Sequence, residues 1–422
     1  MKISIQSLGT LGDVVPYLGL AQGLIAAGHE VSFLSTEEFT GIISEHGIST
    51  PPPIPVKITE WMIEAEERGT LSNPLTFLRD WKRMVKPTID GAFHASVFAA
   101  KGADLVISNL AVTPRAAAEI HKIPLIFASQ QPVLANTGQV PCALVTGRNL
   151  GQLGNRTTYL ARTLLEIVAN ASVMKHRRNA GLPRNIFPSM RSHLGKPLPL
   201  ITTIARPLID NPPTDWHANN YLTNYWRADL NQNWACPPEL SAFFQSGPPP
   251  IYVGLGSMTL KKPEIFANAV LKALKKSGDR ALLSTKHFAS FLPDDSPHML
   301  CDFAPHDQIF PHCASIIHHG GAGTTTSALA SGRPQAIIPH FLDQFWHARH
   351  MNALGLVPKF SSTLKITPQK VEKMLHHLKD PNSIQIAKSA QTKLNSQNGV
   401  ERAINIIERH VSDFSSDLSN HR

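Results

Sequence analysis

Short apolar runs alternate with amphipathic stretches from the start of the chain. Residues 2–8 form a run that predicts a buried strand, residues 16–27 have helical spacing, and residues 31–35 predict a second strand. A strand, a glycine-containing turn, a helix and a strand form a βαβ unit, which places its strands in a parallel sheet. Residues 104–108 and 125–129 repeat the apolar run.

The same alternation begins again in the second half of the chain. Short apolar runs predict strands at 251–255, 281–285, 298–303, 314–318 and 335–338. Helical patterns at 263–276 and 324–331 lie between them. Two such series predict an α/β protein with two Rossmann-like domains rather than one long sheet.

The boundary between the two series falls in an irregular segment. Residues 207–250 are rich in proline, asparagine and tryptophan and lack periodicity, which is typical of a linker. We therefore expect domains at 1–215 and 216–395. Apolar residues with helical spacing predict a C-terminal helix within residues 396–422, followed by a tail.

Composition excludes several classes of protein. Of 422 residues, 42% are hydrophobic and 17% are charged, which argues against a disordered or coiled-coil chain. No run reaches the roughly eighteen apolar residues that a membrane-spanning helix needs. The N-terminus has the pattern of a strand rather than of a signal peptide. The four cysteines form no CxxC pair, which favours a reducing, cytoplasmic compartment over a disulfide framework or a zinc site.

Positive charge is concentrated in one segment. The chain has 40 Lys and Arg against 31 Asp and Glu, a net charge of +9, and residues 148–206 hold ten basic residues and one acid, Glu166. Such a segment can contact nucleic acid, an anionic membrane or an anionic small molecule. No helix-turn-helix, RRM or OB signature accompanies it, so nucleic acid is not an expected partner. A solvated basic face and peripheral contact with an anionic membrane remain as interpretations.

The segment His318–Gly332, HHGGAGTTTSALASG, has the most specific chemistry. It follows a predicted strand and opens a helix, and its glycines let a ligand approach the backbone closely. Unpaired N–H groups and the helix dipole then favour phosphate, and His319 can donate a hydrogen bond to a diphosphate without a metal. A tight turn without a ligand is the alternative. The loop GLGS at 254–257 also follows a strand and lies at the same edge of the sheet.

Two further stretches fit a nucleotide sugar. Phe303 can stack on a base while His306 binds its edge, and Asp343 beside Gln344 can hold sugar hydroxyls. A metal cluster is a second interpretation of the residues around Asp343, but their spacing matches no dense ligand pattern, and no metal is expected. The histidines concerned are His340, His347 and His350.

In combination these motifs resemble the UDP-glycosyltransferase superfamily (glycosyltransferase family 1), which has the GT-B fold, and within it the sterol glucosyltransferases and their bacterial relatives. The resemblance is carried by FAPHDQIFPHCASIIHHGGAGTTTSALASGRPQAIIPHFLDQFWHARHMNALGL, by PTDWHANNYLTNYW and PPPIYVGLGSM, and by the N-terminal GTLGDVVPYLGLAQGLIAAGHEVSFLS. It is weak from about residue 57 to 206. It implies two domains facing across a cleft, with an acceptor in the first, a nucleotide-sugar donor in the second, and C-terminal helices that cross back to the first.

Position by position, the resemblance implies a donor site in the second domain. Phe303 stacks on the base, His306 lies at its edge, and His319 binds the diphosphate. Asp343 and Gln344 hold the sugar. The remaining donor contacts come from loop residues: Gly12, Gly256, Ser257, Gly321, Gly323 and Thr324.

Asp13 is the candidate catalytic residue. It follows the turn that ends at Gly12, at the top of the first strand, where a carboxylate can face the cleft. We interpret it as the general base for the acceptor hydroxyl, with burial raising its pKa, while a helix N-cap is the alternative. Plant members of the superfamily have a histidine here. They also have a glutamate for the ribose hydroxyls where this chain has Ser327, which leaves uridine and deoxythymidine both open.

One displacement with one base predicts inversion at the sugar carbon, and a helix N-terminus with His319 can stabilise the leaving group without a metal. The resemblance implies a hexosyltransferase whose co-substrate is a nucleotide sugar, with UDP-glucose the first choice. The expected acceptor is a lipophilic alcohol such as a sterol or another lipid. The alternatives are a polyketide or similar metabolite as acceptor, a non-catalytic nucleotide-sugar-binding protein, and a sugar epimerase. The predicted acceptor pocket, which core packing explains equally well, comprises Trp61, Phe77, Trp81 and Met84.

Overall fold

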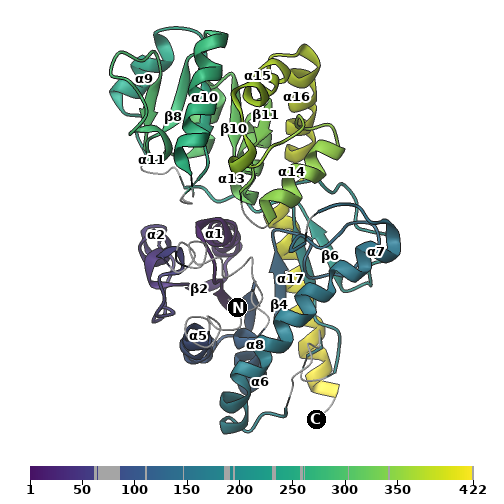
Figure 1. Ribbon diagram of the computed structural model, residues 1–422. Coiled ribbons are helices and arrows are strands. Elements are labelled where there is room, and N and C mark those ends of the chain that lie inside the picture. The colour runs from purple at the N-terminus through teal and green to yellow at the C-terminus, as the bar shows by residue number, and fades with distance from the viewer. Residues whose placement is uncertain are drawn as a thin grey trace.

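The structure is a computed structural model in which two α/β bodies lie one above the other (Figure 1). It describes residues 1–60, 64, 86–109, 112–145, 147–184, 191–192, 195–230, 234–256, 260, 262–302, 304–340 and 343–420. Each body contains one parallel sheet with helices packed around it. The chain thus has the two-domain α/β architecture that its strand and helix pattern predicts.

The first sheet has six parallel strands in the order β2-β1-β3-β4-β5-β6. The strands are β1 (Lys2–Gln6), β2 (Glu30–Leu34), β3 (Leu105–Ser108), β4 (Leu125–Ser129), β5 (Leu200–Thr203) and β6 (Asn220–Thr223). The helices are α1 (Leu11–Ala26), α2 (Thr40–Glu45), α5 (Lys86–Ala99), α6 (Thr113–His121), α7 (Gly151–Thr158) and α8 (Leu160–Asn179). The central strands are buried along their whole length, because helices cover both faces of a parallel sheet.

The second sheet has five parallel strands in the order β11-β10-β7-β8-β9. They are β7 (Ile251–Gly254), β8 (Ala281–Ser284), β9 (Met299–Cys301), β10 (Ser315–His318) and β11 (Gln335–Ile337). Its helices are α9 (Pro238–Gln245), α10 (Pro263–Ser277), α11 (Thr285–Phe288), α12 (His306–Ile309), α13 (Ala322–Ser331), α14 (Asp343–Ala353), α15 (Pro368–Leu378) and α16 (Pro381–Asn395).

Helix α1 begins earlier than the sequence pattern indicates. It starts at Leu11 rather than at Pro16, because Thr10 and Asp13 form a capping box that opens the helix one turn before the proline. Pro16 therefore lies inside the helix and leaves only the Gly12 carbonyl without its usual donor. At the other end of the chain, α17 (Gly399–Asn420) is helical over most of the predicted tail.

The first sheet extends further along the chain than expected. Strand β6 lies beyond residue 215 and inside the segment predicted as a linker, and α9 occupies another part of that segment. Strands β5 and β6 were not predicted, because LITT and NYLT are short and half polar.

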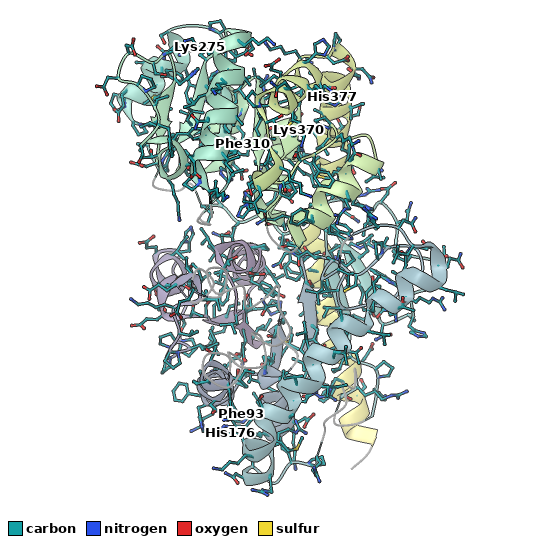
Figure 2. The ribbon with its side chains drawn as sticks, viewed as in Figure 1. Phe93, His176, Lys275, Phe310, Lys370 and His377 are labelled. Carbon is teal, nitrogen blue, oxygen red and sulfur yellow. The ribbon has the colours of Figure 1, made fainter. Side chains whose placement is uncertain are left out.

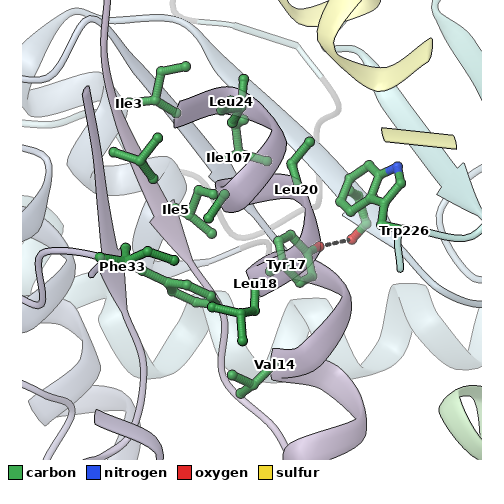
Figure 3. Packing of buried hydrophobic residues seen from close by; sticks show 14 of the residues in the cluster. Ile3, Ile5, Val14, Tyr17, Leu18, Leu20, Leu24, Phe33, Ile107 and Trp226 are labelled. Carbon is green, nitrogen blue, oxygen red and sulfur yellow. Dashed lines mark hydrogen bonds between the residues drawn. The ribbon is translucent and has the colours of Figure 1, made fainter. Parts of the chain in front are cut away.

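Helix α1 packs against the core of the first sheet. Ile5 and Phe33 are fully buried beneath it, and the Tyr17 hydroxyl donates a hydrogen bond of 2.8 Å to the carbonyl oxygen of Ala128 (Figure 3). The Tyr17 ring meets the edge of Trp226 at 5.5 Å. This packing fixes the N-terminal end of α1 above the carboxyl edge of the sheet.

Helix α17 crosses back from the second domain to the first, as the resemblance implies. Figure 1 shows it in yellow beside the first sheet. Ala403 and Ile407 belong to the same buried cluster as α1, and the His29 Nε2 atom lies 3.1 Å from the Glu408 carboxylate. None of the described helices combines the length and the apolar character needed to cross a bilayer.

Candidate functional site

A cavity of about 920 Å³ lies between the two domains. Its first wall comes from the loops that follow β1, β3 and β4, and its second wall from the loops that follow β7, β8, β9, β10 and β11. The carboxyl ends of both sheets thus face the same space. This is the edge at which open parallel sheets bind their ligands.

The N-terminus of α13 points into this cavity. Gly321 is the N-cap residue, and Gly321, Gly323 and Thr324 line the wall. A Cβ at Gly321 would lie 2.5 Å from the His319 Nε2 atom, and one at Gly256 would lie 2.8 Å from the His319 Cε1 atom. Both glycines are therefore needed to make room for the imidazole, and the backbone N–H groups of α13 remain open to an anion.

His319 is buried in this wall as a neutral imidazole. Burial, followed by the neighbouring histidines His318 and His340, holds its pKa well below the usual value. Its Nδ1 atom is buried and has no hydrogen-bond partner among the described residues. A neutral imidazole still carries one N–H, which can donate to an anionic oxygen.

His318 stabilises the glycine loop through hydrogen bonds at both of its ring nitrogens. Its Nδ1 atom accepts a hydrogen bond of 3.0 Å from the Gly320 backbone N–H, and its Nε2 atom lies 2.8 Å from the Gln335 Oε1 atom. The first bond requires a lone pair on Nδ1, which assigns the proton to Nε2. His318 thus holds the glycine loop in shape from below.

His306 also lines the cavity, as the first residue of α12, the short helix after β9. It stacks on Phe310 with ring centroids 4.4 Å apart, and burial lowers its pKa to about 4, so it is neutral at pH 7. Of the other predicted donor residues, Phe303 and Ser257 lie outside the described residues.

Asp343 and Gln344 begin α14 at the same cavity. The Gln131 Nε2 atom donates a hydrogen bond of 2.7 Å to Asp343 Oδ2, which joins the two domains. Burial, followed by repulsion from Asp13, raises the pKa of Asp343 to about 7. The Gln344 Oε1 atom accepts from the His340 backbone N–H at 3.0 Å, so Gln344 also fixes the loop before α14.

Asp13 faces these groups from the first domain. Its Oδ2 atom accepts hydrogen bonds from the Thr10 backbone N–H at 2.8 Å and from the Thr10 hydroxyl at 3.1 Å. Its carbonyl oxygen accepts from Ser7 and Gln130. Burial raises the pKa of Asp13, and the two bonds from Thr10 oppose that rise. Asp13 is therefore not the N-cap residue, which is Thr10, but lies at the third position of α1 and closes the capping box with Oδ2, so that its Oδ1 atom takes no part in capping.

The acceptor side of the cavity is apolar. The predicted residues Trp61, Phe77, Trp81 and Met84 lie outside the described residues. The described lining on this side includes Ile89 and Ala92 of α5, Val112 before α6, Leu144, and Ala169 of α8. This wall can accept a ligand without hydrogen-bonding groups.

Sequence reasoning missed the pair Gln130–Gln131, which holds Asp13 from one side and Asp343 from the other. The sequence does offer one sign of their role, since both amide side chains come directly after the apolar run of β4, at the edge of the sheet where ligands bind. Across the cavity, an Arg227 guanidinium N–H donates to an Asp307 carboxylate oxygen at 3.4 Å. That contact joins the chain crossing between the domains to α12, the short helix after β9.

Several arginines of the basic segment 148–206 form ion pairs with acidic residues of the same chain. Arg177 and Arg162 form ion pairs while largely buried, and two further arginines pair with aspartates. The pairs are Arg162–Glu166, Arg177–Glu119, Arg156–Asp215 and Arg206–Asp210. The charge of this segment is therefore not wholly available to a partner.

The three histidines near Asp343 differ in their contacts, and both ring nitrogens of His340 are buried without a hydrogen-bond partner among the described residues. The His350 Nε2 atom lies 2.8 Å from the Leu208 carbonyl oxygen, and the His347 Nδ1 atom lies 3.7 Å from Asp343 Oδ2. Within the described part of the chain, no group of three or more histidine, cysteine or acidic side chains is arranged to hold a metal ion.

Known proteins match both halves of the chain. Residues 3–137 match the glycosyltransferase family 28 N-terminal domain, and residues 285–398 match the C-terminal domain of the erythromycin biosynthesis protein CIII-like family. Sterol 3-beta-glucosyltransferases are similar over most of the chain. The protein from Penicillium rubens is 29% identical over 84% of the chain, and that from Aspergillus fumigatus is 26% identical over 100%. The chain spans 27% and 30% of their respective lengths.

Solved structures share the fold. The calicheamicin glycosyltransferase CalG4 superposes with a TM-score of 0.67 at 17% identity, covering 97% of this chain and 98% of that one. The glycosyltransferase SnogD from Streptomyces nogalater has a TM-score of 0.66 at 18% identity, with 97% and 99% covered. The two matched domain families, the sequence relatives and the shared fold therefore agree with the motifs around the cavity, and together they support a place for the chain in the UDP-glycosyltransferase superfamily, near the sterol glucosyltransferases.

Proposed function

We propose that the protein is an inverting glycosyltransferase that moves glucose from UDP-glucose to the hydroxyl of a lipophilic alcohol such as a sterol. The observation that carries the proposal is the placement of Asp13 and the N-terminus of α13 on opposite walls of one cavity. A base and an anion site across one space are what a single displacement at a sugar carbon needs. The similarity to sterol 3-beta-glucosyltransferases supports the choice of sugar and acceptor.

In this proposal the acceptor enters along the apolar wall and gives its hydroxyl proton to Asp13. Both capping bonds end on Oδ2, so Oδ1 is the oxygen that receives the proton. The raised pKa of Asp13 makes its ionised form a stronger base than a solvated aspartate. The oxygen that loses its proton attacks the anomeric carbon from the side opposite the diphosphate, which inverts the configuration.

The leaving diphosphate lies at the N-terminus of α13. Backbone N–H groups from Gly321 onward and the neutral His319 donate hydrogen bonds to its oxygens, and the positive end of the helix dipole adds to them. This arrangement stabilises the departing charge with the chain's own groups. His306 would lie beside the base, since it lines the same cavity at the start of α12.

Asp343 and Gln344 would hold the sugar hydroxyls. With a pKa of about 7, Asp343 is partly protonated at neutral pH and can both accept and donate hydrogen bonds. Gln131 holds the carboxyl group at 2.7 Å until the sugar arrives. Ser327, on the same wall, would face the ribose.

A donor and acceptor panel tests this function. The protein is incubated with UDP-glucose or a dTDP-linked hexose, together with a sterol, a long-chain alcohol or a polyketide, and products are identified by mass spectrometry and NMR. The expected product is a β-glucoside of the sterol formed from UDP-glucose. A polyketide glycoside as the main product would show that the acceptor is a polyketide rather than a sterol. Donor binding with no product from any pair would favour a non-catalytic binding protein, and acceptor-independent change of the sugar would favour an epimerase.

The proposal includes peripheral contact of the first domain with an anionic membrane that contains the acceptor. The basic segment 148–206 motivates this contact. Four of its arginines form ion pairs within the chain, so the basic residues expected to contact the membrane are the exposed ones outside these pairs.

A further inference from the structure

Half of the large apolar side chains that are exposed among the described residues fall within residues 144–165. Four of them define what we call the leucine face, carried by α7, α8 and the residue before α7. They are Leu150, Leu153, Leu160 and Leu164, with exposed fractions of 56%, 81%, 60% and 63%. Large apolar side chains that are exposed together within one short segment of a chain are typical of an interaction site.

Helix α8 has a buried side that includes polar and charged residues. Its inward side is held by buried Glu166, Asn170, Val173 and Arg177, at helical spacing. The C-terminal half of the helix is fixed against α5 by His176, which stacks on Phe93 with ring centroids 4.7 Å apart (Figure 2). The opposite side of the helix is therefore held toward solvent.

The exposed side of α8 is apolar near its N-terminus and basic near its C-terminus. Leu160 and Leu164 lie one turn apart on it, and continuing at helical spacing leads to Ala171, Lys175 and Arg178, all of them exposed. Neither Lys175 nor Arg178 forms an ion pair with another described residue. Leucines followed by basic side chains on one helix face match the chemistry of an acyl boundary bordered by anionic headgroups.

The segment that contains the leucine face also contributes residues to the cavity. Leu144 is 37% exposed and also lines the cavity, and Ala169, another lining residue, lies one turn beyond the exposed Leu165 on α8. The lining of the cavity thus reaches the surface at Leu144, and through Ala169 it shares α8 with the leucine face.

We propose that the leucine face and the basic end of α8 dock on an anionic lipid membrane, from which a membrane-dissolved alcohol enters the cavity past Leu144 and Ala169. The docking step stands on the surface alone, and the delivery step rests on the proposed function. An anionic membrane is the occupant that fits this surface, because exposed leucines and the exposed basic side chains of Lys175 and Arg178 lie along one face of α8.

Vesicle flotation tests the docking step. Wild-type protein should float with vesicles of phosphatidylcholine mixed with phosphatidylserine and bind more weakly to phosphatidylcholine alone. The triple variant Leu153→Gln, Leu160→Gln, Leu164→Gln should bind about a hundredfold more weakly, because three apolar side chains leave the lipid while helix propensity is kept. The double variant Lys175→Gln, Arg178→Gln should lose about tenfold in low salt and little in high salt.

The matched control replaces exposed apolar residues of the second domain, in the variant Leu354→Gln, Leu364→Gln, Ile384→Gln. It should bind vesicles like the wild type. Equal binding by the leucine-face variant and the wild type would overturn the proposal. So would a stable dimer in sedimentation velocity that the leucine-face variant dissociates, because the leucines would then cover a second copy.

Transfer assays separate this inference from the proposed function. The leucine-face variant should glucosylate an acceptor in detergent micelles at the wild-type rate and lose at least about tenfold on the same acceptor in vesicles, in line with its weaker docking. Equal loss in both media would overturn the delivery step. If no acceptor is glucosylated by the wild type, the proposed function fails while flotation still decides the docking step.

Discussion

Thr10 donates two hydrogen bonds to Asp13 Oδ2, from its backbone N–H and from its hydroxyl. Each bond favours the ionised carboxylate and so lowers the pKa that burial has raised. The same residue that opens α1 thus adjusts the basicity of the proposed catalytic group.

The variant Thr10→Val removes the hydroxyl bond and keeps the backbone bond. The pKa of Asp13 should rise, and the acid limb of kcat/KM should move to higher pH by up to about one unit. Thr10→Ser keeps a hydroxyl and serves as the control with an unmoved limb. A pH profile that is identical in Thr10→Val and the wild type would show that Asp13 is not the group that titrates.

Asp343 makes stability depend on pH in the direction opposite to that of an ion-paired aspartate. Its folded pKa of about 7 lies above the unfolded value of about 4, so the folded state binds the extra proton and stability falls as pH rises through this interval. Asp343→Asn removes the ionisation and keeps an oxygen for Gln131. The melting temperature of this variant relative to the wild type should therefore be higher at about pH 8.5 than at about pH 5. A difference that is constant across pH would contradict the raised pKa.

At the scale of elements, the packing of α1 and α17 against the segment that connects the two domains requires glycine at two positions. A Cβ at Gly19 would lie 2.5 Å from the Arg227 carbonyl oxygen, and one at Gly399 would lie 2.1 Å from the Asn224 carbonyl oxygen. Both neighbours are backbone atoms, which cannot rotate away. These two glycines allow α1 and α17 to meet the connecting segment closely.

Gly19→Ala should lower the free energy of unfolding by about 1–3 kcal/mol, because the methyl group overpacks a backbone contact. Gly41→Ala in α2 is the matched control, since a Cβ there meets no atom within 4 Å, and it should be neutral or raise stability by up to about 1 kcal/mol. Urea unfolding measures both. Equal effects of the two substitutions on the free energy of unfolding would contradict a steric clash between a Cβ at position 19 and the Arg227 backbone.

The strands most readily predicted were those with unbroken apolar runs, such as LIFAS in β4, because burial on both faces removes alternation. The start of α1 was misplaced because Pro16 is typical of a first helical turn, whereas the capping box at Thr10 begins the helix earlier. The glycine loop was located correctly since its glycines follow a strand. The contact between Gln131 and Asp343 spans 212 positions and has no spacing signal, and the pairs Arg177–Glu119 and Arg156–Asp215 were hidden for the same reason. The pairs Arg162–Glu166 and Arg206–Asp210 are four residues apart, a spacing that the sequence does show.

At the scale of the whole molecule, the two domains are joined by a shared apolar cluster. Trp346 of α14 is fully buried in it, and its indole N–H donates a hydrogen bond of 3.1 Å to the Pro141 carbonyl oxygen of the first domain. The return of α17 adds a second connection. The domains are therefore expected to unfold together.

UDP should raise the midpoint of one common thermal transition, seen alike by circular dichroism and by tryptophan fluorescence. Saturation to about a hundred times the dissociation constant should add about 2.7 kcal/mol to the stability of the folded state. UMP, which lacks the second phosphate, is the control and should add less at the same concentration. Two separate transitions, of which UDP moves only one, would contradict a single cooperative unit.

The variant Asp13→Asn tests the central claim most directly, because an amide keeps an oxygen for the capping bonds and cannot take a proton from the acceptor. Calorimetric titration with UDP and the rate of transfer are measured on the same preparation, with Asp295→Asn, an exposed loop position, as the control. The account predicts UDP affinity within about twofold of the wild type and transfer reduced by at least about a hundredfold. Transfer by Asp13→Asn within about tenfold of the wild type would contradict the assignment of Asp13 as the base.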